Sequence, residues 1–318
     1  MVQKRTEMKY IYLAHSEMSL RCLEGLIKKS FIPSLVVISV SKGLNQQFKS
    51  EMNVICIENG IEFINICDKC EQGEIRILER TEDLIPLIRD YDFGLSVGFM
   101  KILPESVFNV PLNGMINLHC GKLPQYRGRA PISRAIMEGE KSVMITVHKI
   151  DKGVDSGDML EEFEINLNEN DDVNTIYEKC CEASGKVAIK AIRKLAKGNA
   201  HFRKQEPDLA PREKISDEER RIKWNMTARV AFNQIRAITF PYPGATVSYG
   251  GKEYIVLASE IVKENGNQEK QGGEILSIGE RNVEVAMSDG SLLLKDIFKN
   301  GSLLKDYKKE FKEGRRFK

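Results

Sequence analysis

The chain has 318 residues, a length that favours two domains, each large enough to bury a hydrophobic core. Hydrophobic residues make up 42% of the chain and charged residues 30%, which argues against disordered, collagen-like and membrane proteins. The net charge of +2 creates no field over the whole chain that would attract nucleic acid.

The N-terminal region contains one short apolar run, residues 10–14, which is too brief for a signal peptide or a membrane span. Seven cysteines, an odd number, are scattered along the chain, a pattern typical of reduced thiols. We therefore expect a cytoplasmic protein with no membrane partner.

The first half of the chain alternates apolar runs with helical patterns. The runs predict buried strands at residues 10–13, 35–40, 54–57, 93–97 and 115–118. Between them, residues 19–29 place four apolar side chains on one face of a helix. Such alternation predicts right-handed crossovers and a mainly parallel sheet with helices on both faces, the Rossmann-like α/β arrangement.

The pattern changes in the second half. The longest predicted helix covers residues 173–197 and ends at Gly198, and a polar segment with Pro207 and Pro211 follows as a linker. After a helix at residues 227–238, the sequence predicts short strands separated by glycine-rich turns at residues 245–249, 253–257, 274–278, 283–286 and 291–294. We predict a catalytic domain at residues 1–206 and, after the linker, a small OB-like β-barrel domain within residues 207–318.

Asn117 and His119 end a predicted strand, at the edge where open parallel sheets bind their ligands. Their side chains project to the same side, because side-chain directions in a strand repeat every two residues. An amide donor next to an imidazole can bind a developing oxyanion while the imidazole moves protons, which suits acyl transfer. The same residues can also simply cap a turn.

A second cluster, residues 151–158, contains three aspartates and two glycines. The glycines allow a tight loop, and such segments often form ordinary turns. A carboxylate brought beside His119 would orient the imidazole ring and stabilise its protonated form.

The two clusters together resemble the folate-dependent formyltransferases. The run INLHCGKLPQYRGRAPISRAI, followed by HKIDKGVDSGDML, is similar to the signature in which an Asn-x-His pair and a later Asp form the catalytic set. Matched residue by residue, the resemblance implies that Asn117, His119 and Asp155 are catalytic. It covers about residues 8–200 well and the remainder more loosely.

The segment SVGFMKILPESVF, residues 96–108, resembles the loop whose backbone holds the pterin in that family. The resemblance implies 10-formyltetrahydrofolate as the formyl donor, without a metal. The cofactor residues that it implies are Lys101, Ile102, Leu103, Arg129, Asp151, Lys152, Gly153 and Val154.

The chemistry of these groups suggests a mechanism in which Asn117 and protonated His119 stabilise the negative oxygen that develops while the formyl group is transferred. Asp155 keeps His119 charged and assists proton transfer to the leaving folate nitrogen.

The acceptor amine separates two branches of the family, the sugar-nucleotide formyltransferases and methionyl-tRNA formyltransferase. The tRNA enzymes carry a long basic loop after the second strand, whereas the stretch SVSKGLNQQFKSEMN contains only Lys42 and Lys49, a poor phosphate clamp. The sequences YRGRAP and PYPGATVSYGG also resemble the sugar branch. We therefore expect a small-molecule amino-sugar nucleotide as substrate, with initiator tRNA as the alternative.

Two other classes of function fit less well. A nicotinamide-dependent dehydrogenase is disfavoured because the chain has no Gly-x-Gly-x-x-Gly segment. A folate-binding scaffold without turnover stays open, although the complete Asn, His and Asp set argues against it. Whether the second domain forms a homodimer also stays open.

Overall fold

The computed structural model describes residues 8–40, 46–67, 77–266 and 270–318. The chain forms two compact units. The first contains the residues up to 128 together with 143–165 and 177–211, and the second contains residues 129–142, 166–176 and 212–318. The second unit thus includes two short segments, residues 129–142 and 166–176, from the part of the chain predicted to be the catalytic domain. The domain boundary between residues 206 and 207 stays a prediction.

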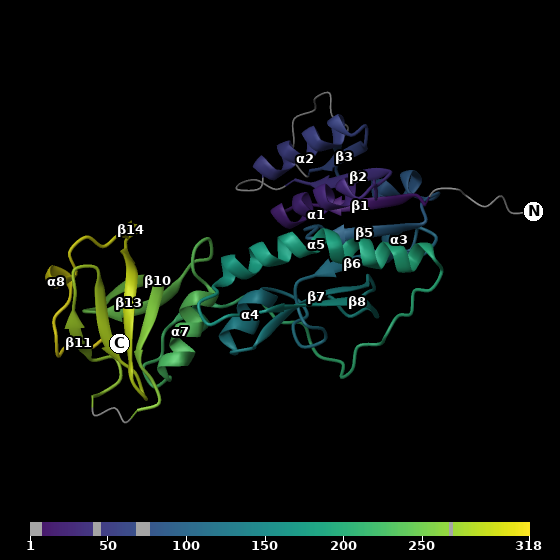
Figure 1. Cartoon of the computed structure of the whole chain (residues 1–318). Coiled ribbons are helices and arrows are strands. Elements are labelled where there is room, and N and C mark those ends of the chain that lie inside the picture. Colours follow the sequence, from purple (N-terminus) through teal and green to yellow (C-terminus); the bar gives the residue numbers. More distant parts are fainter. Residues whose placement is uncertain (1–7, 41–45, 68–76, 267–269) are drawn as a thin grey trace, which may run out of the picture. The chain divides into compact units, whose positions relative to one another are not determined.

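An eight-stranded sheet forms the centre of the first unit (Figure 1), in the order β4-β3-β2-β1-β5-β6-β7-β8. Its strands are β1 (Tyr10–Ala14), β2 (Leu35–Ser39), β3 (Glu62–Ile66), β4 (Ile77–Leu78), β5 (Phe93–Val97), β6 (Met115–His119), β7 (Ser142–Lys149) and β8 (Met159–Asn166). Strands β1 to β6 pair in parallel, whereas β7 is antiparallel to β6. The chain moves outward from β1 to β4 and then returns to β5 on the other side of β1. This reversal creates the kind of crevice where such sheets bind ligands.

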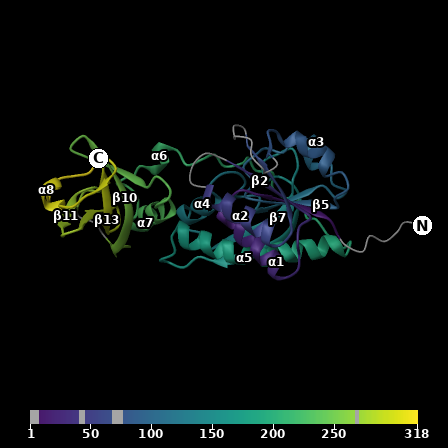
Figure 2. The same cartoon turned by 90° about the horizontal axis from the view of Figure 1, so that it is seen from above.

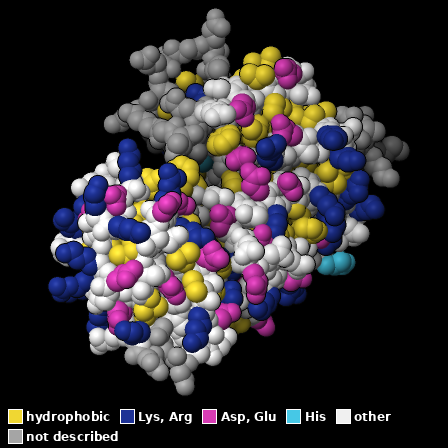
Figure 3. All heavy atoms as spheres, turned by 60° about the vertical axis from the view of Figure 1, so that its left-hand side comes forward, with side chains coloured by type: hydrophobic (Ala, Val, Ile, Leu, Met, Phe, Trp, Pro, Cys, Tyr) yellow, Lys and Arg dark blue, Asp and Glu magenta, His cyan; other side chains and the backbone are white. Residues whose placement is uncertain are grey.

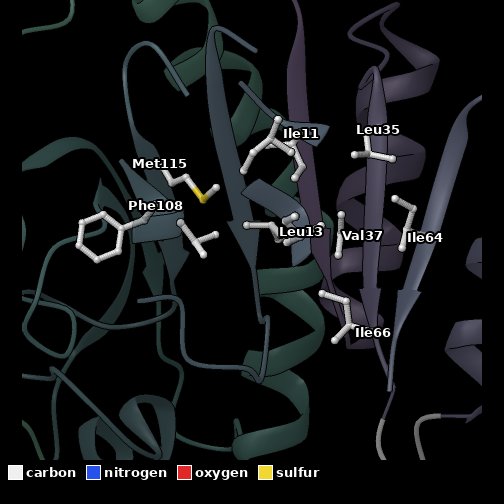
Figure 4. Packing of buried hydrophobic residues seen from close by; sticks show 11 residues of the cluster. Ile11, Leu13, Leu35, Val37, Ile64, Ile66, Phe108 and Met115 are labelled. Carbon is white, nitrogen blue, oxygen red and sulfur yellow. The ribbon is translucent and has the colours of Figure 1, made fainter. Parts of the chain in front are cut away.

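Helices cover both faces of this sheet (Figure 2). They are α1 (Glu17–Lys28), α2 (Gln46–Glu58), the 3₁₀ helix η1 (Thr81–Leu87), α3 (Glu105–Phe108) and α5 (Val173–Ala196). On the face of η1 and α3, alternate residues such as Ile11 and Leu13 point into a cluster that includes Leu84 and Val107 (Figure 4). These side chains are buried, and their removal from water is the main force that fixes this face.

Helices α1 and α5 approach each other closely on the opposite face. The Tyr12 hydroxyl of β1 donates a 2.7 Å hydrogen bond to the carbonyl of Ser19 in α1. A Cβ atom added at Gly185 in α5 would lie 3.1 Å from the Cα of Gly25 in α1. The two glycines therefore permit a backbone-to-backbone contact that larger residues would prevent.

The strand predicted at residues 54–57 is wrong, because these residues belong to helix α2. Their apolar run is not buried as a unit: Met52 and Cys56 are fully buried, while Val54 and Ile57 are 50% and 67% exposed. That spacing is helical, and the third strand of the sheet, β3, begins only at Glu62.

The second unit contains an antiparallel sheet in the order β11-β12-β13-β10-β9, with β14 paired to β13. Its strands are β9 (Ala245–Tyr249), β10 (Lys252–Lys263), β11 (Ile275–Ile278), β12 (Asn282–Ala286), β13 (Ser291–Lys299) and β14 (Ser302–Leu303). The last residues of the chain join the two edges: the Ile275 N–H donates to the Arg315 carbonyl, and Ser248 and Lys318 exchange two backbone hydrogen bonds.

The helices of the second unit are α4 (Pro131–Met137), α6 (Asp217–Arg220), α7 (Ala228–Ala237) and α8 (Tyr307–Glu310). Helix α4 packs on α7, and Arg134 of α4 forms an ion pair with Glu219 of α6. The buried Arg236 of α7 donates to the carbonyls of Asn168 and Asp171. These contacts explain why residues 129–142 and 166–176 belong to the second unit.

The predicted fold class is confirmed: a mainly parallel sheet with helices is followed by an antiparallel β domain. On the face shown in Figure 3, acidic and basic side chains are intermingled, as the small net charge predicts. In the described part of the chain, each helix is too short or too polar to cross a lipid bilayer.

Candidate active site

Three polar side chains meet where β6 and β7 pair. Asn117 and His119 are alternate residues of β6 and therefore project to one side. The antiparallel register places His148 of β7 directly opposite Asn117. The Asn117 Nδ2 atom lies 3.3 Å from the His148 Nε2 atom, and the ring centroids of His119 and His148 are 6.3 Å apart.

Asp155, on the loop between β7 and β8, completes this cluster. Its Oδ2 atom lies 3.5 Å from the His119 Nδ1 atom, and its Oδ1 atom lies 3.4 Å from the His148 Nε2 atom and 3.5 Å from the Asn117 Nδ2 atom. The backbone N–H of Gly128 donates a 2.9 Å hydrogen bond to Oδ2. The backbone of Asp155 is left-handed, with φ of 50°, a conformation that costs a non-glycine residue free energy and is held by its surroundings.

The charges of this cluster depend on one another. Burial alone would raise the pKa of Asp155, but His119, His148 and the Gly128 N–H together hold it well below its ordinary value, so the carboxylate is ionised. Burial lowers the pKa of His119 below its ordinary 6.5, and the attraction of Asp155 opposes this shift. The expected protonation of His119 is therefore favoured by Asp155 and disfavoured by burial.

Both ring nitrogens of His119 face oxygen atoms. The Nε2 atom lies 2.7 Å from the carbonyl oxygen of Tyr126, and the Nδ1 atom faces Asp155. A neutral imidazole donates from one nitrogen only, whereas an imidazolium donates from both. This arrangement can therefore receive a proton on His119 and stabilise the resulting cation.

A cavity of about 510 Å³ in the first unit adjoins this cluster. Asn117, His148 and Asp155 line it, whereas the 9% exposed His119 is not among its lining residues. The predicted cofactor residues that line the cavity are Lys101, Ile102, Leu103, Asp151, Lys152, Gly153 and Val154. The two segments singled out from the sequence thus face one cavity.

Arg129, the remaining predicted cofactor residue, belongs to the second unit. Its side chain is exposed, and its backbone N–H donates to the carbonyl of Arg212 in that unit. Its assignment to the cofactor stays a prediction.

His148 is the main residue that the sequence analysis left out. It is 2% exposed, and its Nδ1 atom lies 2.7 Å from the carbonyl oxygen of Lys149, so Nε2 is the nitrogen that faces Asp155. The available signal was its place in the apolar run just before the aspartate-rich loop. The described residues contain no group of three or more His, Cys, Asp or Glu side chains placed to hold a metal ion.

Comparison with known proteins identifies the family of both parts of the chain. Residues 45–192 match the family model described as formyl transferase, and residues 214–308 match the model described as formyl transferase, C-terminal domain. The crystal structure of WlaRD, a sugar 3N-formyl transferase studied in the presence of dTDP and 5-N-formyl-THF, has the same fold. Its TM-score is 0.66 at 18% identity, over 93% of this chain and 99% of WlaRD.

Two relatives of known name are similar in sequence, and both are methionyl-tRNA formyltransferases. The protein from Caldicellulosiruptor saccharolyticus is 36% identical over 63% of this chain and 64% of its own length. The protein from a Sulfurihydrogenibium species is 36% identical over 70% of this chain and 69% of its own length. The predicted resemblance is confirmed by these matches and by both domain models: the chain belongs to the formyltransferase family.

Proposed function

We propose that this chain transfers the formyl group of 10-formyltetrahydrofolate to the amino group of an amino-sugar nucleotide. The observation that carries the reaction is the ionised Asp155, which lines the cavity and lies within 3.5 Å of His119, His148 and Asn117. Membership of the formyltransferase family supports the formyl group, and the 5-N-formyl-THF present with WlaRD supports a reduced folate as donor.

The cavity suits a reduced folate in its chemistry. Ile102 and Val154, which are 89% and 57% exposed, offer apolar surface that a flat heterocycle would cover. Lys101 brings positive charge to a ligand that carries carboxylates, whereas Lys152 is ion-paired at 2.9 Å with Glu105 of the same cavity. Asn117 and Asp155 place polar groups where the formyl group would react.

Formyl transfer forms a bond between the acceptor nitrogen and the formyl carbon and breaks the bond from that carbon to the folate nitrogen. The acceptor nitrogen loses a proton and the folate nitrogen gains one. A group that takes up a proton and gives it back must therefore lie close to both nitrogens or be connected to them through a hydrogen-bonded group.

His119 is that group in our proposal. Because burial lowers its pKa, the ring is largely neutral at neutral pH and can accept the proton of the amine. The imidazolium then has Asp155 and the Tyr126 carbonyl as acceptors, and its charge stabilises the negative formyl oxygen together with the Asn117 amide. Asp155 lines the cavity and lies beside His119. The proton can therefore pass between the cavity and His119 through the Asp155 carboxylate, and it returns to the leaving folate nitrogen by the same route.

The choice of a sugar nucleotide rests on the connection between β2 and α2. Strand β2 ends at Ser39 and α2 begins at Gln46, which leaves only residues 40–45 for the loop that carries basic residues in the tRNA enzymes. Lys42 is the one basic residue of that interval and lies outside the described residues. So short a segment with one positive charge offers little binding to the phosphates of an acceptor stem. The dTDP present with WlaRD supports a nucleotide-linked acceptor.

Initiator tRNA is the second candidate acceptor, because the two relatives described above are named methionyl-tRNA formyltransferase. The two acceptors can be compared in one experiment. The protein is incubated with 10-formyltetrahydrofolate and either a panel of dTDP- and UDP-linked amino sugars or methionine-charged initiator tRNA, and tetrahydrofolate release is followed. We expect turnover with an amino-sugar nucleotide. Turnover with tRNA alone would reverse the choice of acceptor, and no turnover with either would refute the proposed reaction.

His119→Ala separates chemistry from binding in the same assay. We expect it to abolish turnover and to leave the binding of the non-reactive analogue 5-formyltetrahydrofolate, measured by calorimetry, within about twofold, because His119 does not line the cavity. Substantial residual turnover would show that another group moves the proton.

A further inference from the structure

A segment far along the chain lies against the Asp155 loop. Met159, at the start of β8, and Arg203 exchange two backbone hydrogen bonds, each of 2.8 Å. This pairing fixes the register of the segment after Arg203 and places Gln205 beside residues 155–157. The sequence alone reads this polar, proline-containing stretch as a surface linker.

Gln205 is 8% exposed and uses its whole carboxamide. Its Nε2 donates to the carbonyl of Asp155 at 2.8 Å and to that of Gly157 at 2.7 Å, and its Oε1 accepts from Arg127 Nε at 2.8 Å. The orientation of this amide is determined by its partners, since carbonyls only accept and a guanidinium only donates.

Arg127 connects Gln205 to the segment that donates a hydrogen bond to the Asp155 carboxylate. The Arg127 side chain is 4% exposed, and its Nη1 donates to the Asp208 carboxylate at 2.6 Å and to the Leu209 carbonyl at 2.7 Å. The next residue, Gly128, is the one whose N–H bonds to Asp155 Oδ2. The Gln205–Arg127 pair therefore holds both the backbone of Asp155 and the donor that its side chain uses.

Asp155 needs such support for two reasons. Its left-handed backbone is not the conformation that an aspartate prefers, so without restraint the residue would relax. Its separations from His119 and His148, 3.5 and 3.4 Å, are already long for a hydrogen bond between a carboxylate and an imidazole, so a small displacement would break the contact.

We propose that Gln205 and Arg127 are positioning residues, which hold the Asp155 carboxylate against His119. The inference rests on the proposed role of Asp155 in formyl transfer. It predicts an effect on the charge state of His119 itself, which a contact that served only to stabilise the fold would leave unchanged. Asp155 and His148 are the titratable groups whose charges act on His119.

The test uses the titration of His119 in the full-length protein. The chain has only four histidines, so their ring signals are resolved by NMR, and His119→Gln assigns one of them. Gln205→Met keeps a long unbranched side chain but removes all three hydrogen bonds. Lys204→Ala, at an exposed neighbouring residue, is the matched control.

In Gln205→Met we expect the pKa of His119 to fall by about one unit, because the attraction of the displaced carboxylate weakens. We also expect kcat to fall by about tenfold to a hundredfold, with KM for the formyl donor within about twofold. Gln205→Leu also removes the three hydrogen bonds and adds no charge, so it should give the same result. It carries the test if Gln205→Met does not fold.

Two outcomes would overturn the inference: an unchanged His119 titration in a folded Gln205 variant, or an equal shift in Lys204→Ala. The NMR comparison needs no acceptor. A wild-type protein without turnover would therefore refute the proposed function and still leave this measurement decisive for the Gln205–Arg127 pair.

Discussion

Asp155→Asn removes one charge from the centre of the site and keeps the size of the side chain. Asparagine tolerates the left-handed backbone of residue 155, so the loop should keep its conformation. Two full charges separated by the 3.5 Å between Asp155 and His119 interact by about 5 kcal/mol at an effective dielectric constant of about 20. Losing half of this energy from the transition state slows turnover about 50-fold, and losing all of it slows turnover about 3,000-fold.

The assay is kcat for tetrahydrofolate release at saturating donor and acceptor, with thermal unfolding as the check on folding. Asp158→Asn is the matched control, because it removes the same charge from the same loop and no hydrogen bond or ion pair involves the Asp158 side chain in the described part of the chain. We expect the control to stay within about twofold. A folded Asp155→Asn protein that keeps more than about a fifth of wild-type kcat would refute the electrostatic argument.

Gly185→Val should lower the free energy of unfolding, measured by urea titration, by about 1–3 kcal/mol, because the valine side chain would collide with the Gly25 backbone. An unchanged midpoint of unfolding would contradict the close contact between α1 and α5. Ile102→Asp should raise KM for the formyl donor by about tenfold or more without lowering the melting temperature, since this residue is 89% exposed at the cavity; an unaltered KM would place the donor elsewhere. Acid should destabilise the protein through Asp155: the unfolded state takes up a proton near its ordinary pKa and the folded state only at lower pH. Stability is then lost as pH falls below about 4, and the melting temperature of Asp155→Asn should fall less steeply there.

The sequence pattern was sufficient to predict the parallel sheet, whereas the meeting of the polar segments was implied by the family resemblance. Strands of a parallel sheet end at one edge, so the residues after residue 97 and around residue 117 were bound to lie close together. The antiparallel direction of β7 was harder to predict, because the pattern of apolar residues in a strand does not indicate whether the strand runs parallel or antiparallel to its neighbour. That direction places His148 opposite Asn117, which explains why the sequence did not assign His148 to the site.

Gln205 could not be found from the sequence for a different reason. It lies 50 positions after Asp155, in a polar stretch whose composition is that of an exposed linker. Its burial depends on two backbone hydrogen bonds between Met159 and Arg203, and backbone pairing of single residues has no side-chain pattern. By contrast, the helix at residues 54–57 did carry a signal, the spacing of Met52 and Cys56, which the β-branched residues between them obscured.

The division of the chain into two units bears on how the acceptor is selected. Among the described residues, those that line the 510 Å³ cavity and those that bond to Asp155 lie in the first unit. In the proposed mechanism these groups act on the formyl carbon and the two nitrogens, which both candidate acceptors share. The proposed choice of acceptor therefore depends on residues outside this cavity, such as residues 40–45, which contain a single lysine.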